Sequence, residues 1–174
     1  MGKFFEGTGH YYEYVRADQG TVISWQEANK HASQKNWNGV QGYLPDIFEE
    51  NENKFIHGLS GNTNSWNIGL TDDVQEGHYI WSGGEKKGQR FTWNNDWNPF
   101  WNGEPNNAYH DPWGDEDYIG MYNSGYWNDW PYWTGFPGYV VEYGREGAEY
   151  KLEEVSISNG IEGSTDSIIT FKFD

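Results

Sequence analysis

The chain has 174 residues, a length typical of one domain, and its 27 acidic and 11 basic residues give a net charge of −16. This charge argues against a nucleic-acid or anionic-membrane partner, because such surfaces need clustered Lys and Arg. The 19% of aromatic residues exclude a disordered acidic polymer, and the absence of cysteine excludes disulfides, thiolate zinc sites and cysteine nucleophiles. No segment approaches the roughly 18 apolar residues of a membrane span.

The first 60 residues predict one strand and two helices. Residues 10–16 combine aromatic and β-branched side chains, which favours a strand. Ser24 stands three residues before Glu27, the spacing of a capping box, so a helix is expected to start at Trp25. A second helix is expected to begin near Asp46, with an apolar stripe and with glutamates opposite or flanking it. The stripe comprises Ile47, Asn51, Phe55, Ile56 and Leu59, and the glutamates are Glu49, Glu50 and Glu52.

The rest of the chain to residue 144 predicts short strands around one long loop. Strand-like segments at 66–70, 78–81, 118–122 and 138–143 are separated by Gly, Asn, Asp and Pro. Residues 82–117 show little periodicity, and a loop of that length in a compact domain is usually functional. Four tryptophans are expected in the core and four others either line a site or pack inside. The first group is Trp66, Trp81, Trp93 and Trp127, and the second is Trp101, Trp113, Trp130 and Trp133.

An acidic stretch without fixed cations extends from Phe91 to Gly144. It contains no Lys or Arg but eight carboxylates, which would repel one another. A bound metal ion would relieve this repulsion, and a solvated acidic surface is the alternative. The eight residues are Asp96, Glu104, Asp111, Asp115, Glu116, Asp117, Asp129 and Glu142.

Three segments of this stretch carry oxygen ligands suited to Ca²⁺, which takes six to eight oxygens from carboxylates, amides, carbonyls and water. They lie at 104–107, 115–117 and 127–129. An Asn amide donates a hydrogen bond to a hydroxyl oxygen, and a neighbouring carboxylate accepts the hydroxyl hydrogen. A cation flanked by Glu and Asn is therefore suited to binding the ring hydroxyls of a sugar.

From about Gly9 to Gly144 the sequence resembles the C-type lectin-like domains. The resemblance implies an α+β fold with two helices, small antiparallel sheets and a long calcium and ligand loop. It rests on ordered motifs: the first-helix start 24–28, the second-helix segment 44–56, Trp66-Asn67-Ile68-Gly69-Leu70, Glu104-Pro105-Asn106 and Trp127-Asn128-Asp129. Asn67 is an extra residue in the third of these motifs.

The resemblance also implies specific ligands. A principal calcium ion and the sugar would be bound by Glu104, Asn106, Glu116 and Asn128, with Asp129 as a further calcium ligand. An auxiliary calcium ion would be bound by Asp72, Glu76, Asn107, Glu116 and Asp117. The Glu-Pro-Asn triplet implies mannose, fucose, glucose or N-acetylglucosamine rather than galactose. Pro105 is expected to follow a cis peptide bond.

Two departures from the family pattern affect these expectations. Tyr118 and a residue near Tyr139 stand where cysteines are expected, so aromatic packing has to replace the cross-links, as in bacterial adhesin modules. A long insertion at 108–114 leaves open whether Asp111 or Asp115 replaces Glu116 as a ligand. The same insertion offers Tyr109, His110 and Trp113 as a wall for a second sugar.

Residues 1–145 are expected to form the domain, and 146–174 a β-hairpin tail or the start of a neighbouring module. The expected function is calcium-dependent binding of glycans with mannose-, fucose- or glucose-type termini, for adhesion and without enzymatic chemistry. We expect an extracellular or cell-surface location within a larger multidomain protein. A calcium-dependent protein-binding module is the alternative, and a glycosidase would need two carboxylates across a cleft.

Overall fold

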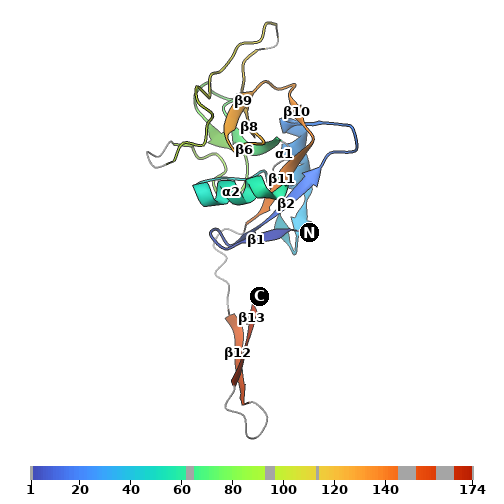
Figure 1. Cartoon of the computed structure of the whole chain (residues 1–174), viewed down its shortest axis with the longest axis vertical. Helices are drawn as coiled ribbons and strands as arrows, with labels where there is room; N and C mark the ends of the chain where they lie inside the picture. Colours follow the sequence, from blue (N-terminus) through green and yellow to red (C-terminus); the bar gives the residue numbers. More distant parts are fainter. Residues whose placement is uncertain are drawn as a thin grey trace.

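Two ten-residue helices, α1 (Trp25–Gln34) and α2 (Glu50–Leu59), pack with a seven-stranded sheet (Figure 1). The structure is a computed structural model that describes residues 2–61, 65–92, 97–112 and 114–144, together with the backbone of strands at 152–159 and 167–173. Trp93 and Trp113 therefore lie outside the described residues. Within the described part of the chain, no helix has the length and apolarity to cross a bilayer.

The main sheet joins strands from both ends of the domain. Its order is β1 (Lys3–Phe5), β2 (His10–Arg16), β11 (Gly138–Tyr143), β6 (Trp66–Thr71), β8 (Tyr118–Met121) and β9 (Trp127–Trp130), with β7 (Ile80–Trp81) also paired to β6. Only β11 and β6 pair in parallel among these described strands. Two-stranded sheets are formed by β3 (Ile23–Ser24) with β10 (Gly135–Phe136), β4 (Asn36–Trp37) with β5 (Val40–Gln41), and β12 (Leu152–Asn159) with β13 (Ser167–Phe173). The α+β architecture agrees with the sequence prediction, whereas the domain boundary near residue 145 stays a prediction.

The first helix begins as its sequence predicts. Ser24 Oγ accepts a hydrogen bond from the Glu27 backbone N–H at 3.3 Å, and the Glu27 carboxylate accepts one from the Ser24 N–H at 3.2 Å. This reciprocal pair satisfies two N–H groups that a helix start leaves without partners. Trp25 is buried, and its Nε1 donates to the Ile68 carbonyl in β6 at 2.7 Å, which fixes α1 against the sheet.

The second helix begins at Glu50, four residues later than predicted. Two backbone N–H groups just before the helix are satisfied by carboxylates instead: Asp46 N–H donates to Glu142 Oε2, 96 residues away, and Phe48 N–H donates to Glu52 Oε2 in the first turn of α2, both at 3.0 Å. Asn51, which was predicted on the apolar stripe, is exposed, so that assignment was wrong, and Glu52, expected opposite or flanking the stripe, is fully buried.

Strand β6 is the centre of the core, and all six of its residues are buried. Gly69 approaches the preceding segment so closely that a Cβ there would lie 2.6 Å from the Leu44 carbonyl oxygen, and its N–H donates to the Pro45 carbonyl at 2.9 Å. The extra Asn67 is accommodated by a 3.4 Å bond from its amide to the Ile23 carbonyl. The expected core positions of Trp66, Trp81 and Trp127 are confirmed.

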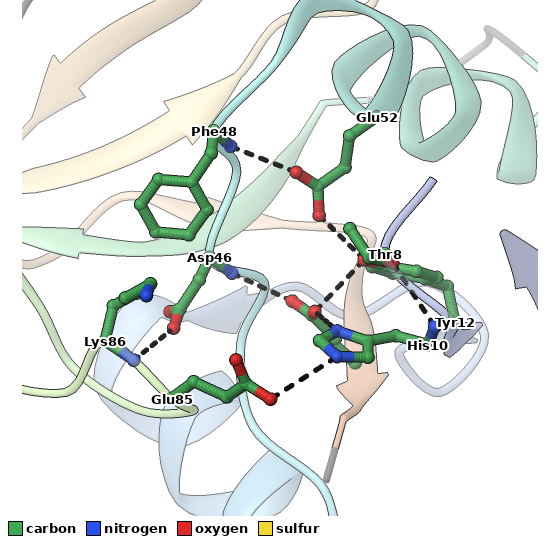
Figure 2. Close-up of polar contacts among 9 residues, drawn as sticks. Thr8, His10, Tyr12, Asp46, Phe48, Glu52, Glu85 and Lys86 are labelled. Carbon is green, nitrogen blue, oxygen red and sulfur yellow. Dashed lines mark hydrogen bonds and ion pairs between the residues drawn. The ribbon is translucent and has the colours of Figure 1, made fainter. Parts of the chain in front are cut away.

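Three buried carboxylates, from Asp46, Glu52 and Glu142, form a cluster through shared hydrogen-bond partners. Figure 2 shows Asp46 and Glu52 beside Tyr12 and His10 of β2. Tyr12 Oη lies 2.7 Å from Glu52 Oε1 and 3.0 Å from Glu142 Oε1, and His10 Nδ1 lies 2.5 Å from the same Glu142 oxygen. Burial, and then the charge of Glu142, raise the pKa of Asp46 to about 9 and that of Glu52 to about 8. Glu142 therefore belongs to this carboxylate cluster rather than to the acidic loop, which corrects its assignment to a group neutralised by a loop metal.

Candidate functional site

Strand β9 carries the Asn-Asp pair of the candidate site into the interior. Asn128 and Asp129 are 5% and 0% exposed, and β9 pairs along its length with β8. The Asp129 carboxylate accepts hydrogen bonds from the backbone N–H groups of Asn106 at 3.3 Å and Asn107 at 2.7 Å. The long loop is thereby folded onto β9 immediately after Pro105, whose preceding peptide bond is cis as expected.

Glu116 makes three contacts within the same loop. Its Oε2 accepts the Ala108 N–H at 3.1 Å, its Oε1 lies 3.0 Å from His110 Nε2, and its own N–H donates to Asn107 Oδ1 at 3.2 Å. Glu116 is buried, whereas Asp111 is exposed. Glu116 thus bonds within the loop that contains Asn106 and Asn107, and Asp115 is half-buried beside it, so the choice of Glu116 over Asp111 or Asp115 as a ligand stays a prediction.

Two buried oxygens of this principal group have no hydrogen-bond partner among the described residues, namely Glu104 Oε2 and Asn128 Oδ1. Burial, followed by the charges of Asp129 and Glu116, raises the pKa of the Glu104 carboxyl. An unsatisfied buried oxygen is costly, and adjacent carboxylates repel each other. The donor set consists of hard oxygens and so fits Ca²⁺, which would satisfy the free oxygens and offset the repulsion.

A second acidic group lies where β6 ends. Asp72 is 1% exposed, its Oδ2 accepts the Gly77 N–H at 2.8 Å, and its Oδ1 lacks a hydrogen-bond partner among the residues the structure describes. The Asp72 N–H donates to the Asp117 carbonyl at 3.1 Å. Burial and the charges of Glu76 and Asp117 raise the pKa of Asp72 to about 7.

Of the five residues expected at the auxiliary site, Asp72 and Asp117 are joined by this backbone hydrogen bond, and Glu76 lies within electrostatic range of Asp72. The other two, Asn107 and Glu116, bond to each other within the principal group. Across the described ranges, no three His, Cys, Asp or Glu side chains form a ready-made metal cage. Amide oxygens, backbone carbonyls and water would have to complete a calcium shell in either group.

Of the expected aromatic wall, His110 is the part best supported by contacts. Its ring lies 5.4 Å from that of Trp133, which in turn lies 5.2 Å from Tyr132. Tyr109 is 68% exposed, and Trp113 lies outside the described residues. Tyr132 was missed by sequence reasoning, although its place three residues after the Asn-Asp pair was an available signal.

No protein-family model matches the chain. A segment of 143 residues, 78% of this chain, is 34% identical to halomucin of Haloquadratum walsbyi, of which it covers 1%. The hepatic lectin of Gallus gallus is 30% identical over 128 residues, 73% of this chain and 51% of the relative. The chain thus spans about half or less of the curated relatives it matches.

Among solved structures, the cow C-type carbohydrate-recognition domain of CD23, determined in the presence of a GlcNAc2Man3 oligosaccharide, superposes with a TM-score of 0.62 at 24% identity. The match covers 83% of this chain and 93% of that domain.

Proposed function

The chain is a C-type lectin-like domain in fold, and from that premise we propose that it is a calcium-dependent carbohydrate-binding module for sugars with mannose- or fucose-type vicinal hydroxyls. One observation carries the proposal: within the part of the chain that the structure describes, a buried oxygen of Glu104 and one of Asn128 lie without hydrogen-bond partners in a group that already contains Asp129 and Glu116. This group favours a hard cation, and the Glu-Pro-Asn triplet at 104–106 favours mannose-type hydroxyls.

Glu104, Asn106, Glu116, Asn128 and Asp129 would hold the ion. When bound, calcium would supply coordination positions for two neighbouring sugar hydroxyls. The side chains act beside it: the amide groups donate N–H to hydroxyl oxygens, and the carboxylates accept the hydroxyl hydrogens. The backbone bonds from Asn106 and Asn107 to Asp129 hold these groups in place before a sugar arrives.

A second calcium ion would be held by Asp72, Glu76 and Asp117, with Asn107 and Glu116 completing the set. These residues would fix the end of β6 against the loop. We further propose that the module binds without chemistry, at the cell surface or outside the cell, within a longer adhesive protein. Because one exposed sugar offers little contact, adhesion would depend on many modules acting together.

The test is retention on immobilised mannose and fucose. The wild type should be retained in millimolar calcium and released by a chelator. Asn106→Asp removes an N–H donor and should reduce retention more than about tenfold, whereas Asn102→Asp, which adds the same charge at another exposed position of the loop, should have no effect. Retention that survives the chelator, or that Asn106→Asp leaves intact, would contradict the proposal. Protein binding that free mannose and fucose fail to displace would favour a protein ligand instead.

A further inference from the structure

Aromatic side chains gather beside the candidate site. Of nine exposed large hydrophobic residues in the described chain, five fall between positions 101 and 133. Three aromatic residues form a continuous row: the Trp101 ring lies 6.3 Å from Tyr122 and 5.4 Å from Tyr126, both edge to face. Trp101 and Tyr126 are 48% and 47% exposed, so the aromatic row, Trp101, Tyr122 and Tyr126, presents apolar surface to solvent.

The aromatic row begins at the candidate site. The Glu104 N–H donates to the Trp101 carbonyl at 2.9 Å, which places the central member of the row three residues from a candidate ligand. Besides burial, the charges of Glu104, Glu116 and Asp129 raise the pKa of Tyr122, so its phenol lies within the field of those carboxylates. The row therefore leads outward from the site, through Tyr122 and Trp101 to Tyr126.

The backbone that carries the row is held by the sheet and by α2. Trp101 N–H donates to the Trp127 carbonyl at 2.9 Å, and Tyr122 N–H donates to the Tyr126 carbonyl at 2.7 Å. The Asn53 amide of α2 donates to the Gly125 carbonyl at 2.9 Å and accepts from Trp127 Nε1 at 2.8 Å. A surface fixed in this way loses little conformational entropy when a ligand packs on it.

We propose that the aromatic row is a subsite for the second sugar of a neutral oligosaccharide whose terminal sugar is held at the candidate site. The inference rests on the proposed function and extends it from a monosaccharide to a linked glycan. Aromatic faces pack on the apolar C–H surfaces of a sugar ring, and the tyrosine hydroxyls offer hydrogen bonds to its alcohols. The adjacent carboxylates, in a chain of net charge −16, disfavour acidic sugars.

The experiment compares a monosaccharide with its oligosaccharide by calorimetric titration in calcium. The probes are methyl α-mannoside with α-mannotriose, and methyl α-fucoside with a fucosylated trisaccharide. In at least one pair the wild type should bind the oligosaccharide about tenfold more tightly than the monosaccharide. Trp101→Ala and Tyr126→Ala should each remove most of that difference and leave monosaccharide affinity unchanged. Trp101→Phe should retain part of it.

The matched control is Phe4→Ala, which removes an aromatic side chain that is 44% exposed in β1, far from the site. Equal affinities of the wild type for both members of each pair would overturn the inference, as would an oligosaccharide preference that survives both alanine variants. In either case monosaccharide binding shows that the proposed function still holds. If the wild type binds no probe, the proposed function fails and the inference fails with it. If Trp101→Ala also abolishes monosaccharide binding, the affinities of Tyr126→Ala for the two probes test the inference instead.

Discussion

Individual carboxylates at the candidate site lie close enough to repel one another. Glu104 lies in the field of Asp129 and Glu116, and one of its oxygens is buried without a hydrogen-bond partner among the described residues. Such a residue contributes little to the stability of the metal-free fold. On the proposed function, Glu104 would contribute to stability in the calcium-bound state, because a ligand that binds only the native state stabilises that state by mass action.

Glu104→Gln should therefore separate stability from binding. The variant removes one repelling charge, so its melting temperature in chelator should equal or exceed that of the wild type. The wild type should gain about 2.7 kcal/mol at a calcium concentration about a hundredfold above its dissociation constant, and the variant should lose most of that gain. Thermal unfolding with and without calcium measures both, with Asp111→Asn as the control in the same loop. A wild-type calcium response in Glu104→Gln would contradict the ligand assignment.

Among the elements, α1 shows how the domain holds together without cysteine. Tyr118, which stands where the family pattern leads one to expect a cysteine, lies 5.0 Å from the Trp25 ring and so joins β8 to α1. Trp25 also reaches β6 through its bond to Ile68. Tyr139, near the other position where a cysteine was expected, is 4% exposed in the same apolar cluster. Aromatic packing thus connects α1, β6 and β8 in a chain that has no cysteine.

Trp25→Ala should destabilise the domain by about 3–5 kcal/mol, because it removes a large buried side chain together with its hydrogen bond to β6. Ser24→Ala, one residue earlier, removes only the helix cap and should cost about 1 kcal/mol. Chemical denaturation followed by tryptophan fluorescence and far-ultraviolet circular dichroism measures both. Equal losses in the two variants would show that α1 is held by its cap rather than by the aromatic contact.

Local patterns predicted some elements correctly and missed others for identifiable reasons. The start of α1 is encoded within four residues by its capping box. The start of α2 is not encoded locally, because the Asp46 N–H before the helix donates to Glu142, which lies 96 residues away. Strand β9 was missed because Asn128 and Asp129 are polar yet buried, the reverse of a usual strand pattern. The ordered motifs predicted the group around Glu104, whereas the aromatic row depends on a hairpin and a loop meeting in space.

At the scale of the whole molecule, the buried carboxylate cluster makes stability depend on pH. The pKa values of Asp46 and Glu52 are raised from 3.8 and 4.5 to about 9 and about 8, and that of His10 is raised as well. Between the unfolded and the folded pKa of each carboxyl, the folded state therefore holds more protons than the unfolded state. The stabilising contribution of the two carboxyls is complete below pH 4 and is lost as the pH rises through 8 and 9.

The free energy of unfolding should fall between pH 6 and pH 9, by at most about 1.4 kcal/mol per pH unit for each group. Denaturant titrations in chelator measure the fall without a divalent cation substituting for the protons. Glu52→Gln should flatten the profile, whereas Glu50→Gln, which alters an exposed residue on the same helix, should not. A profile in the wild type that is flat or rises over this range would contradict the predicted proton uptake.

Strands β2 and β11 lie side by side, with Tyr11 directly opposite Tyr143. In Figure 1 the outer end of this pair lies away from β8 and β9, near which the loop carrying Glu104 folds. The turn that leads into β2 and the residues with which β11 ends are therefore neighbours, and a ligand held near Glu104 would bind at a distance from both.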